Sequence, residues 1–231
     1  MGILFKNIFA DDVKEIGNKK KKIGITQRVD KIKSYDECRD ALDQRLIDWV
    51  VSSDYIPVPI PNSLVDITLP NNLQLNIVNW LSEIGIDTIL LSGGNNIGHF
   101  KERDLTEKNL LLWAKQFKKP VLGICRGMEM MGVHDGVQLK KVEGHVGVRH
   151  KLKIKDASLN LLPSSVNSYH DLALKRCPDE YEVLAVAEDD NIEAIKHNVL
   201  PWEGWMWHPE RETTFNEIDQ VRFKKLVNNG K

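Results

Sequence analysis

Short apolar segments that alternate with helical segments constrain the fold of this chain most strongly. The expected strands lie at 23–26, 55–60, 87–91 and 121–124, and the expected helices between them at 36–51, 73–84 and 105–117. Strands that are apolar on both faces need cover on both sides, which is typical of a parallel sheet between two layers of helices. We therefore expect a three-layer α/β fold with a mostly parallel central sheet.

The second half of the chain has a different sequence pattern. Short β-like segments bounded by turns lie at 147–154, 166–169, 183–187, 192–197 and 204–207, and a last helix is expected at 215–227. These segments predict a partly antiparallel extension of the sheet. We expect a single domain over residues 23–231, preceded by an N-terminal extension at 1–22. That extension ends in four lysines and has no apolar period, so we interpret it as a solvated tail rather than a nuclear or membrane-surface signal.

Composition excludes several classes of protein. The 32 Lys and Arg residues and 33 Asp and Glu residues leave a formal net charge of −1, which argues against a dedicated nucleic-acid binder. No window is apolar over the eighteen or so residues that a membrane helix needs. The three cysteines, Cys38, Cys125 and Cys177, lack CxxC spacing and predict neither a disulfide framework nor a thiolate zinc site. We expect a cytoplasmic protein without a nucleic-acid or membrane partner.

One cysteine lies where an apolar strand passes directly into a helix. The sequence Gly123-Ile124-Cys125-Arg126-Gly127 has the small residues that a sharp strand–turn–helix corner requires, and such a corner exposes a nucleophile at the end of the sheet. A helix N-terminus also favours the thiolate, so we expect a lowered pKa for this thiol. The alternative is a buried structural cysteine, and the corner alone does not decide between them.

A cysteine nucleophile requires a base, and the base requires an acceptor that orients it. His208 and Glu210 are two positions apart, so in an extended chain Glu210 can hold the imidazole. Ordinary structural roles are kept for His99, His134 and His197. His145 and His150 are the residues closest to a metal site, but no third ligand has convincing spacing, so we predict that the protein binds no metal.

Four motifs together resemble those of the class I glutamine amidotransferase superfamily. They are Ser92-Gly93-Gly94, Gly123-Ile124-Cys125-Arg126-Gly127, Val166-Asn167-Ser168-Tyr169-His170 and Trp207-His208-Pro209-Glu210. Within the superfamily, the chain is most similar to the free-standing γ-glutamyl hydrolase branch, which includes γ-glutamyl-γ-aminobutyrate hydrolase. The resemblance extends over residues 22–228, and it implies a flavodoxin-like arrangement of the sheet.

The resemblance implies a Cys-His-Glu triad. Cys125 would attack a γ-glutamyl amide carbonyl, His208 would act as general base and acid, and Glu210 would orient His208. The reaction would pass through a γ-glutamyl thioester on Cys125 that water then hydrolyses. The oxyanion would lie against backbone N–H groups of Arg126 and of the Gly93-Gly94 turn, where the alternative interpretation is a plain turn at the end of a strand.

Substrate contacts are also implied by the resemblance. Glu129 stands where glutaminase members carry glutamine, and a carboxylate there could pair with the α-ammonium of a γ-glutamyl substrate. Residues 167–170, Asn167, Ser168, Tyr169 and His170, match the segment that contacts the glutamyl group. Arg28 follows the first expected strand and could meet an anionic leaving group such as a phosphate or nucleotide. A solvated helix face with ordinary charge pairs stays open as the alternative for Arg28 and its charged neighbours.

Three hypotheses follow. The first is a free-standing hydrolase that releases glutamate and an amine from a small γ-glutamyl compound, with a γ-glutamyl nucleotide amidate of surface-polysaccharide biosynthesis as the more specific expectation. The second is a glutaminase subunit that delivers ammonia to a separate synthase. The third is a non-enzymatic binding protein of the same fold, against which the intact triad argues. We expect a small-molecule substrate and no cofactor; a homodimer or a synthase partner stays open.

Overall fold

The computed structural model describes residues 19–69, 72–155 and 162–229. The proposed N-terminal extension lies almost wholly outside these residues, so it stays a prediction. Within the described residues, no helix combines the length and the apolar character needed to cross a membrane.

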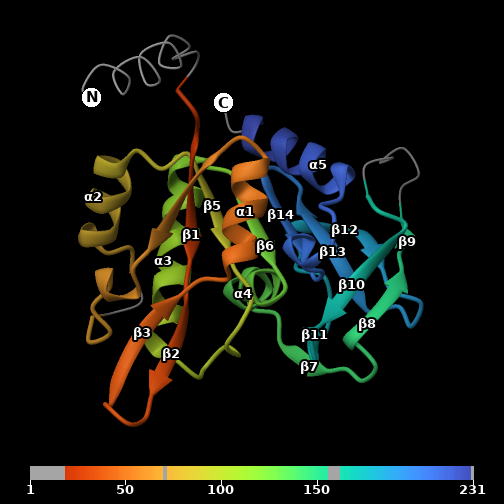
Figure 1. The fold of residues 1–231 in the computed structure, drawn as a ribbon, viewed down its shortest axis with the longest axis horizontal. Coiled ribbons are helices and arrows are strands. Elements are labelled where there is room, and N and C mark those ends of the chain that lie inside the picture. Colours follow the sequence, from red (N-terminus) through yellow and green to blue (C-terminus); the bar gives the residue numbers. More distant parts are fainter. Residues whose placement is uncertain (1–18, 70–71, 156–161, 230–231) are drawn as a thin grey trace, which may run out of the picture.

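A central sheet of eight strands organises the chain (Figure 1). Its order is β4 (Ile56–Ile60), β1 (Lys22–Thr26), β5 (Thr88–Leu91), β6 (Val121–Ile124), β14 (Trp202–Trp205), β13 (Ile192–His197), β12 (Tyr181–Val186) and β9 (Lys153–Ile154). The first five strands are parallel, and the remaining three continue the sheet in antiparallel fashion. The expected mostly parallel sheet with an antiparallel extension is thus confirmed.

Helices cover both faces of this sheet. They are α1 (Gln44–Ser52), α2 (Leu75–Ile84), α3 (Lys101–Phe117), α4 (Arg126–His134) and α5 (Glu217–Asn228). Apolar side chains of α1 and α5 pack into one buried cluster, and those of α2, α3 and α4 pack into another. Neighbouring residues of β5 separate in the same way, since Leu90 belongs to the first cluster and Leu91 to the second. The sheet is therefore apolar on both sides, as the continuous apolar strands predict.

The helix expected at 36–51 begins later than predicted. Residues 37–41 instead form β3 (Glu37–Ala41), which pairs with β2 (Arg28–Ile32) in an antiparallel hairpin. The hairpin turns at Asp36, whose φ of 48° ends any helical path. Asp43 then caps α1 by accepting a hydrogen bond from the backbone N–H of Arg45. The apolar spacing of the helix is real, but the polar residues before it pair as a strand.

Smaller elements surround the carboxyl ends of the parallel strands. Two further two-stranded sheets join β8 (Val146–Lys151) to β10 (Ser165–Tyr169) and β7 (Leu139–Lys141) to β11 (Leu172–Leu174). Two 3-10 helices lie at Asn62–Leu64 and Pro209–Arg211. The prolines of β4 are accommodated because β4 is an edge strand of the central sheet.

Candidate active site

Cys125 stands at the corner between β6 and α4. Its backbone angles, φ 51° and ψ −110°, are unusual for a residue with a side chain and belong to a sharp turn. The turn is anchored by the backbone N–H of Cys125, which donates to the carbonyl of Trp205 at 2.7 Å. Gly127 is required in the next turn, because a Cβ there would overlap the backbone of Leu91. The strand–turn–helix corner expected from the sequence is present.

The Cys125 thiol is less acidic than the sequence analysis expects. Burial raises its pKa above the ordinary value, and the neighbouring Glu129 carboxylate raises it further. The backbone N–H of Arg126, at the start of α4, acts in the opposite direction but does not outweigh them. The expected thiolate is therefore disfavoured in the free protein, because a helix N-terminus stabilises an anion less than burial penalises it here.

His208 and Glu210 form a tight pair. The Nδ1 atom of His208 lies 2.6 Å from Oε1 of Glu210, and both side chains are buried. The pairing does not come from the extended chain that the sequence predicts, because residues 209–211 form a short 3-10 helix. Asn167 fixes the main chain of His208 by accepting from its N–H at 3.0 Å and donating to its carbonyl at 2.8 Å. The imidazole is thus held in place from both its ring and its backbone.

A pocket of about 150 Å³ brings the candidate residues together. Among its lining residues are Cys125, Glu129, Tyr169, His170 and His208. A second hollow, of about 60 Å³, also borders His208 and is lined by Arg28, Gly93, Gly94 and Arg211. Gly94, His208 and Arg211 border both spaces. The candidate base therefore stands between the pocket that contains the thiol and a neighbouring hollow that two arginines line.

Buried charges hold the turn after β5 beside this pocket. The guanidinium of Arg103, fully buried on α3, donates to the carbonyls of Ser92 and Gly93 at 2.8 and 2.9 Å. In a trans peptide the N–H points opposite to the carbonyl, so the N–H of Gly94 points away from Arg103. Glu107 pairs with Arg103 and also with Arg126, the residue after the nucleophile. One network thereby joins the two segments expected to supply oxyanion donors.

Sequence reasoning did not identify Arg103 and Glu107. They are four positions apart on α3, which is an ordinary spacing for an exposed ion pair on a helix. Nothing in the sequence marks this pair as buried, since its other partners lie after β5, at Ser92 and Gly93, and on α4, at Arg126.

Glu129 lies one helical turn after Cys125 and is buried. Burial raises its pKa to about 7, while His170 and Arg126 oppose the shift. At neutral pH the side chain therefore exists both as a carboxylate and as a neutral acid. The carboxylate form is the one that could pair with a substrate ammonium.

The segment 167–170 is divided between two surroundings. Tyr169 and His170 line the Cys125 pocket, and the Tyr169 ring lies edge-on to His208 and beneath the guanidinium of Arg211. Asn167 and Ser168 are not among the lining residues, because their side chains bond to the main chain of His208 and His145. A contact of these two residues with substrate stays a prediction.

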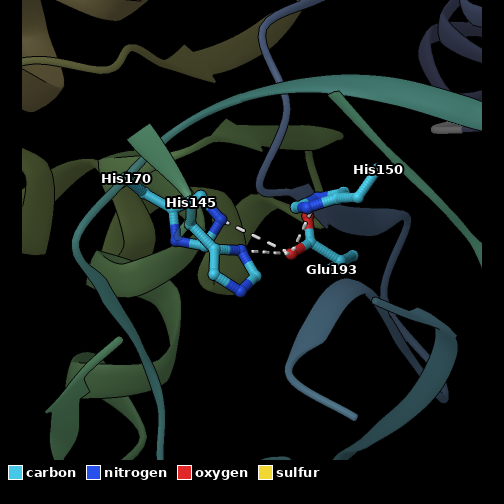
Figure 2. A group of neighbouring side chains, drawn as sticks. All are labelled: His145, His150, His170 and Glu193. Carbon is cyan, nitrogen blue, oxygen red and sulfur yellow. Dashed lines mark ion pairs between the residues drawn. The ribbon is translucent and has the colours of Figure 1, made fainter. Parts of the chain in front are cut away.

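The structure removes the reason for excluding a metal. His145 and His150 lie beside His170 and Glu193, so a third and a fourth potential ligand are present although they are distant in the sequence (Figure 2). His170 belongs to the motif expected to contact the substrate, and no motif marks Glu193.

Comparison with known proteins assigns the chain to a family. Residues 22–210 match the peptidase C26 family. The gamma-glutamyl-CDP-amidate hydrolase of Campylobacter jejuni is 30% identical over 212 residues, which cover 87% of this chain and 95% of that protein. A glutamine-hydrolyzing GMP synthase subunit of Methanococcus vannielii is 31% identical over 176 residues, covering 72% and 89%.

A solved structure supports the fold. A glutamine amidotransferase of Thermotoga maritima superposes with a TM-score of 0.59 at 13% identity and covers 93% of this chain and 91% of its own. At that identity the similarity concerns the fold alone. The family match and the curated relatives indicate an enzyme of the amidotransferase or hydrolase type. The chain belongs to the peptidase C26 family, within the class I glutamine amidotransferase superfamily.

Proposed function

We propose that the protein is a cysteine-dependent hydrolase that cleaves the γ-glutamyl C–N bond of a small metabolite and releases glutamate and an amine. The observation that carries the proposal is the joint placement of Cys125, Glu129 and His208 around one pocket, with Glu210 bonded to Nδ1 of His208. These residues comprise a nucleophile, a base with its orienting carboxylate, and a carboxylate for the substrate ammonium.

The reaction follows from the roles of these groups. The sulfur of Cys125 bonds to the γ-carbonyl carbon while its proton passes to Nε2 of His208, and the oxyanion is stabilised by the N–H groups of Arg126 and the 93–94 turn. Collapse breaks the C–N bond, and His208 returns the proton to the leaving nitrogen. Water then attacks the γ-glutamyl thioester with His208 as base, which releases glutamate and restores the thiol.

The resting state of Cys125 favours proton transfer at the moment of attack. Because burial and Glu129 raise the pKa of the thiol, a preformed thiolate–imidazolium pair is disfavoured in the free enzyme. His208 would therefore act as a general base toward a neutral thiol. Glu210 supports this by stabilising the imidazolium that forms.

The leaving group is proposed to be anionic. His208 must reach the leaving nitrogen, and the second hollow also borders His208, so the leaving group can extend into that hollow. Arg28 and Arg211 line this hollow, and a guanidinium is well suited to a phosphate. The name of the Campylobacter jejuni relative points to the same chemistry, a γ-glutamyl group attached to a nucleotide amidate.

A second function is a glutaminase subunit that supplies ammonia to a separate synthase. The Methanococcus vannielii relative favours it, since its name describes such a subunit. Glu129, in place of glutamine, favours the free-standing hydrolase.

The test is glutamate release by the purified full chain, acting alone on glutamine and on γ-glutamyl amides with neutral, phosphorylated and nucleotide-linked amines. We expect turnover of a nucleotide-linked compound at a much higher kcat/KM than of glutamine. Cys125→Ala should abolish it, whereas Cys38→Ser, at an exposed cysteine, should leave it unchanged. If turnover is absent but Cys125 is still modified by a glutamine-mimicking affinity label, the second function would be favoured. Absence of both turnover and labelling would refute the assignment of Cys125 as nucleophile.

A further inference from the structure

Three histidines and a glutamate converge on one point, and one of them, His170, also lines the Cys125 pocket. His145, His150, His170 and Glu193 each offer a ligand atom, and these four atoms all lie within 4.8 Å of one another. The side chains of His145, His170 and Glu193 are almost completely buried, and that of His150 is largely so. Figure 2 shows the three rings directed toward the carboxylate of Glu193. We name this group the histidine–glutamate cluster.

The distances in the cluster match the ligand shell of a metal better than a set of hydrogen bonds. Oε1 of Glu193 lies 3.5 Å from Nδ1 of His145, 3.3 Å from Nε2 of His150 and 3.4 Å from Nε2 of His170. Charge-assisted hydrogen bonds are shorter, at about 2.7–2.9 Å. Ligands held at about 2.0–2.1 Å in a tetrahedron are about 3.3–3.4 Å apart, which is the separation observed for these three pairs.

The cluster atoms also have no other partners. Among the described residues, no hydrogen bond reaches the three ring nitrogens that face inward or either carboxylate oxygen of Glu193. A buried carboxylate without a hydrogen bond is costly, because desolvation penalises its charge. A cation placed between the four ligand atoms would compensate that cost.

Outer contacts set the tautomers of two rings. Nε2 of His145 lies 2.9 Å from Oδ2 of Asp189, and Nδ1 of His170 lies 2.8 Å from the carbonyl of Leu172. Both oxygens can only accept, so the outer nitrogen of each ring carries the hydrogen. In the neutral rings, the inner nitrogens then present lone pairs to the carboxylate, which is repulsive without a cation. Outer contacts from a carboxylate and a backbone carbonyl are the usual supports of metal-bound histidines.

We propose that the histidine–glutamate cluster binds one zinc ion through His145, His150, His170 and Glu193. The site goes beyond the proposed hydrolase activity and is structural, because four protein ligands complete a tetrahedron and leave no open position for water or substrate. Imidazole and carboxylate donors without thiolate suit zinc, with cobalt(II) as its spectroscopic substitute. The longest separation between ligand atoms exceeds a tetrahedral edge, so zinc would draw at least one ring inward.

The position of the cluster indicates what the ion would hold together. His145 directly precedes β8, His150 lies within β8, His170 follows β10, and Glu193 belongs to β13 of the central sheet. The ion would thus fasten the two-stranded β8–β10 sheet to the central sheet. A surface hollow of about 340 Å³, lined in part by His145, His150 and Asp189, provides a path for the metal from solvent.

The test measures metal content in the full chain after removal of any affinity tag. Protein purified with zinc present should contain about one zinc per chain by plasma mass spectrometry. His150→Gln should reduce this to near background, while His99→Gln, an exposed histidine outside the cluster, should retain one equivalent. Cys125→Ala should also retain it, which distinguishes the cluster from zinc held by the catalytic thiol. The result therefore does not depend on whether the proposed hydrolase activity is correct.

Two further measurements protect the test against a misfolded variant. Asp189→Asn changes a half-exposed side chain outside the ligand shell, and it should weaken zinc binding by about 10–100-fold in a chelator competition. Cobalt(II) added to the metal-free protein should produce the intense visible absorption of a four-coordinate site. Folded wild-type protein that takes up neither metal would overturn the proposal and identify the cluster as histidinium paired with carboxylate. A full equivalent of zinc in folded His150→Gln would overturn the ligand assignment, and unchanged affinity in Asp189→Asn would overturn the supporting role of the outer contact to His145.

Discussion

Gly93 allows a direct test of how closely the candidate base is held. A Cβ built at this position would lie 2.7 Å from Cε1 of His208, whereas ordinary contacts of such an atom begin at 3.4 Å. In Gly93→Ala, the imidazole or the turn must therefore move by about 0.7 Å. The backbone N–H of residue 93 is retained, so the substitution acts on the position of His208 without deleting an oxyanion donor.

The magnitude follows from the restraints on His208. Glu210 holds its ring, and Asn167 holds its main chain through two hydrogen bonds. The ring therefore cannot yield without changing its relation to Cys125. A displacement of about 1 Å costs on the order of 10²-fold in rate, which corresponds to about 2.7 kcal/mol in the barrier. Overpacking should also lower the free energy of unfolding by about 1–3 kcal/mol.

The assay is steady-state glutamate release from the best substrate of the γ-glutamyl panel, together with urea unfolding of the same samples. We expect kcat to fall by about 10²-fold and KM to change little, since Gly93 does not line the pocket that contains Cys125. Gly98→Ala is the matched control: its φ of +93° makes the substitution strained, but its Cβ would meet nothing within 4 Å. It should lose stability and keep most of its activity.

Either of two results would refute this reasoning. Gly93→Ala with a kcat within threefold of wild type would show that His208 is free to move or is not the base. Equal losses of kcat in Gly93→Ala and Gly98→Ala would show that the whole loop matters rather than the contact with the ring.

Three other predictions follow from the same surroundings. His208→Ala should reduce kcat more than Glu210→Gln, because loss of orientation is less severe than loss of the proton carrier; the reverse order in steady-state rates would contradict their roles. Glu129→Gln should speed alkylation of Cys125 by iodoacetamide at pH 8, because it removes the carboxylate charge that raises the pKa of the thiol. It should not do so at pH 6, where Glu129, with a pKa of about 7, is already mostly neutral. Equal alkylation rates of the variant and the wild type at pH 8 would contradict this charge effect. Burial raises the pKa of Asp219 from 3.8 to about 7. The folded state therefore favours the neutral form of this side chain. The resulting contribution to stability is present below pH 4 and is lost as the pH rises to 7 and the buried side chain ionises. Asp219→Asn should therefore be more stable than wild type at pH 8, by up to about 4 kcal/mol in urea unfolding, and similar to it at pH 4.

Most of the fold could be predicted because the parallel strands are buried on both faces. Segments such as 121–124 are continuous apolar runs, and the helices between them carry regular apolar stripes. The β2–β3 hairpin could not be predicted in this way. Its second strand, 37–41, is mostly exposed and carries charged residues at three positions, so no apolar period reveals it. The strand exists because its backbone pairs with residues 28–32.

The same distinction between local patterns and long-range packing applies to the residues of the candidate site. Cys125 and the pair of His208 and Glu210 lie in local motifs, and local motifs can be recognised in a sequence. Arg103 and Glu193 are buried, and each contacts a residue outside its own local motif, the Ser92 carbonyl for Arg103 and His170 for Glu193. The separations between His150, His170 and Glu193 are about twenty residues each, and they match no compact metal-binding motif. Only the packing of β8, β10 and β13 places these side chains together.

The segment 167–170 shows how adjacent residues of one motif meet different surroundings. Successive side chains of an extended chain point to opposite faces, so neighbouring residues of β10, and His170 directly after it, meet different surroundings. Asn167 and Tyr169 lie against His208, whereas Ser168 and His170 lie against His145. The strand therefore stands between the candidate base and the histidine–glutamate cluster. Asn167 of β10 holds the main chain of His208 through two hydrogen bonds. A rearrangement of the histidine–glutamate cluster that shifts β10 would therefore also shift the candidate base. A motif-by-motif interpretation of the sequence treats the cluster and the base as separate sites.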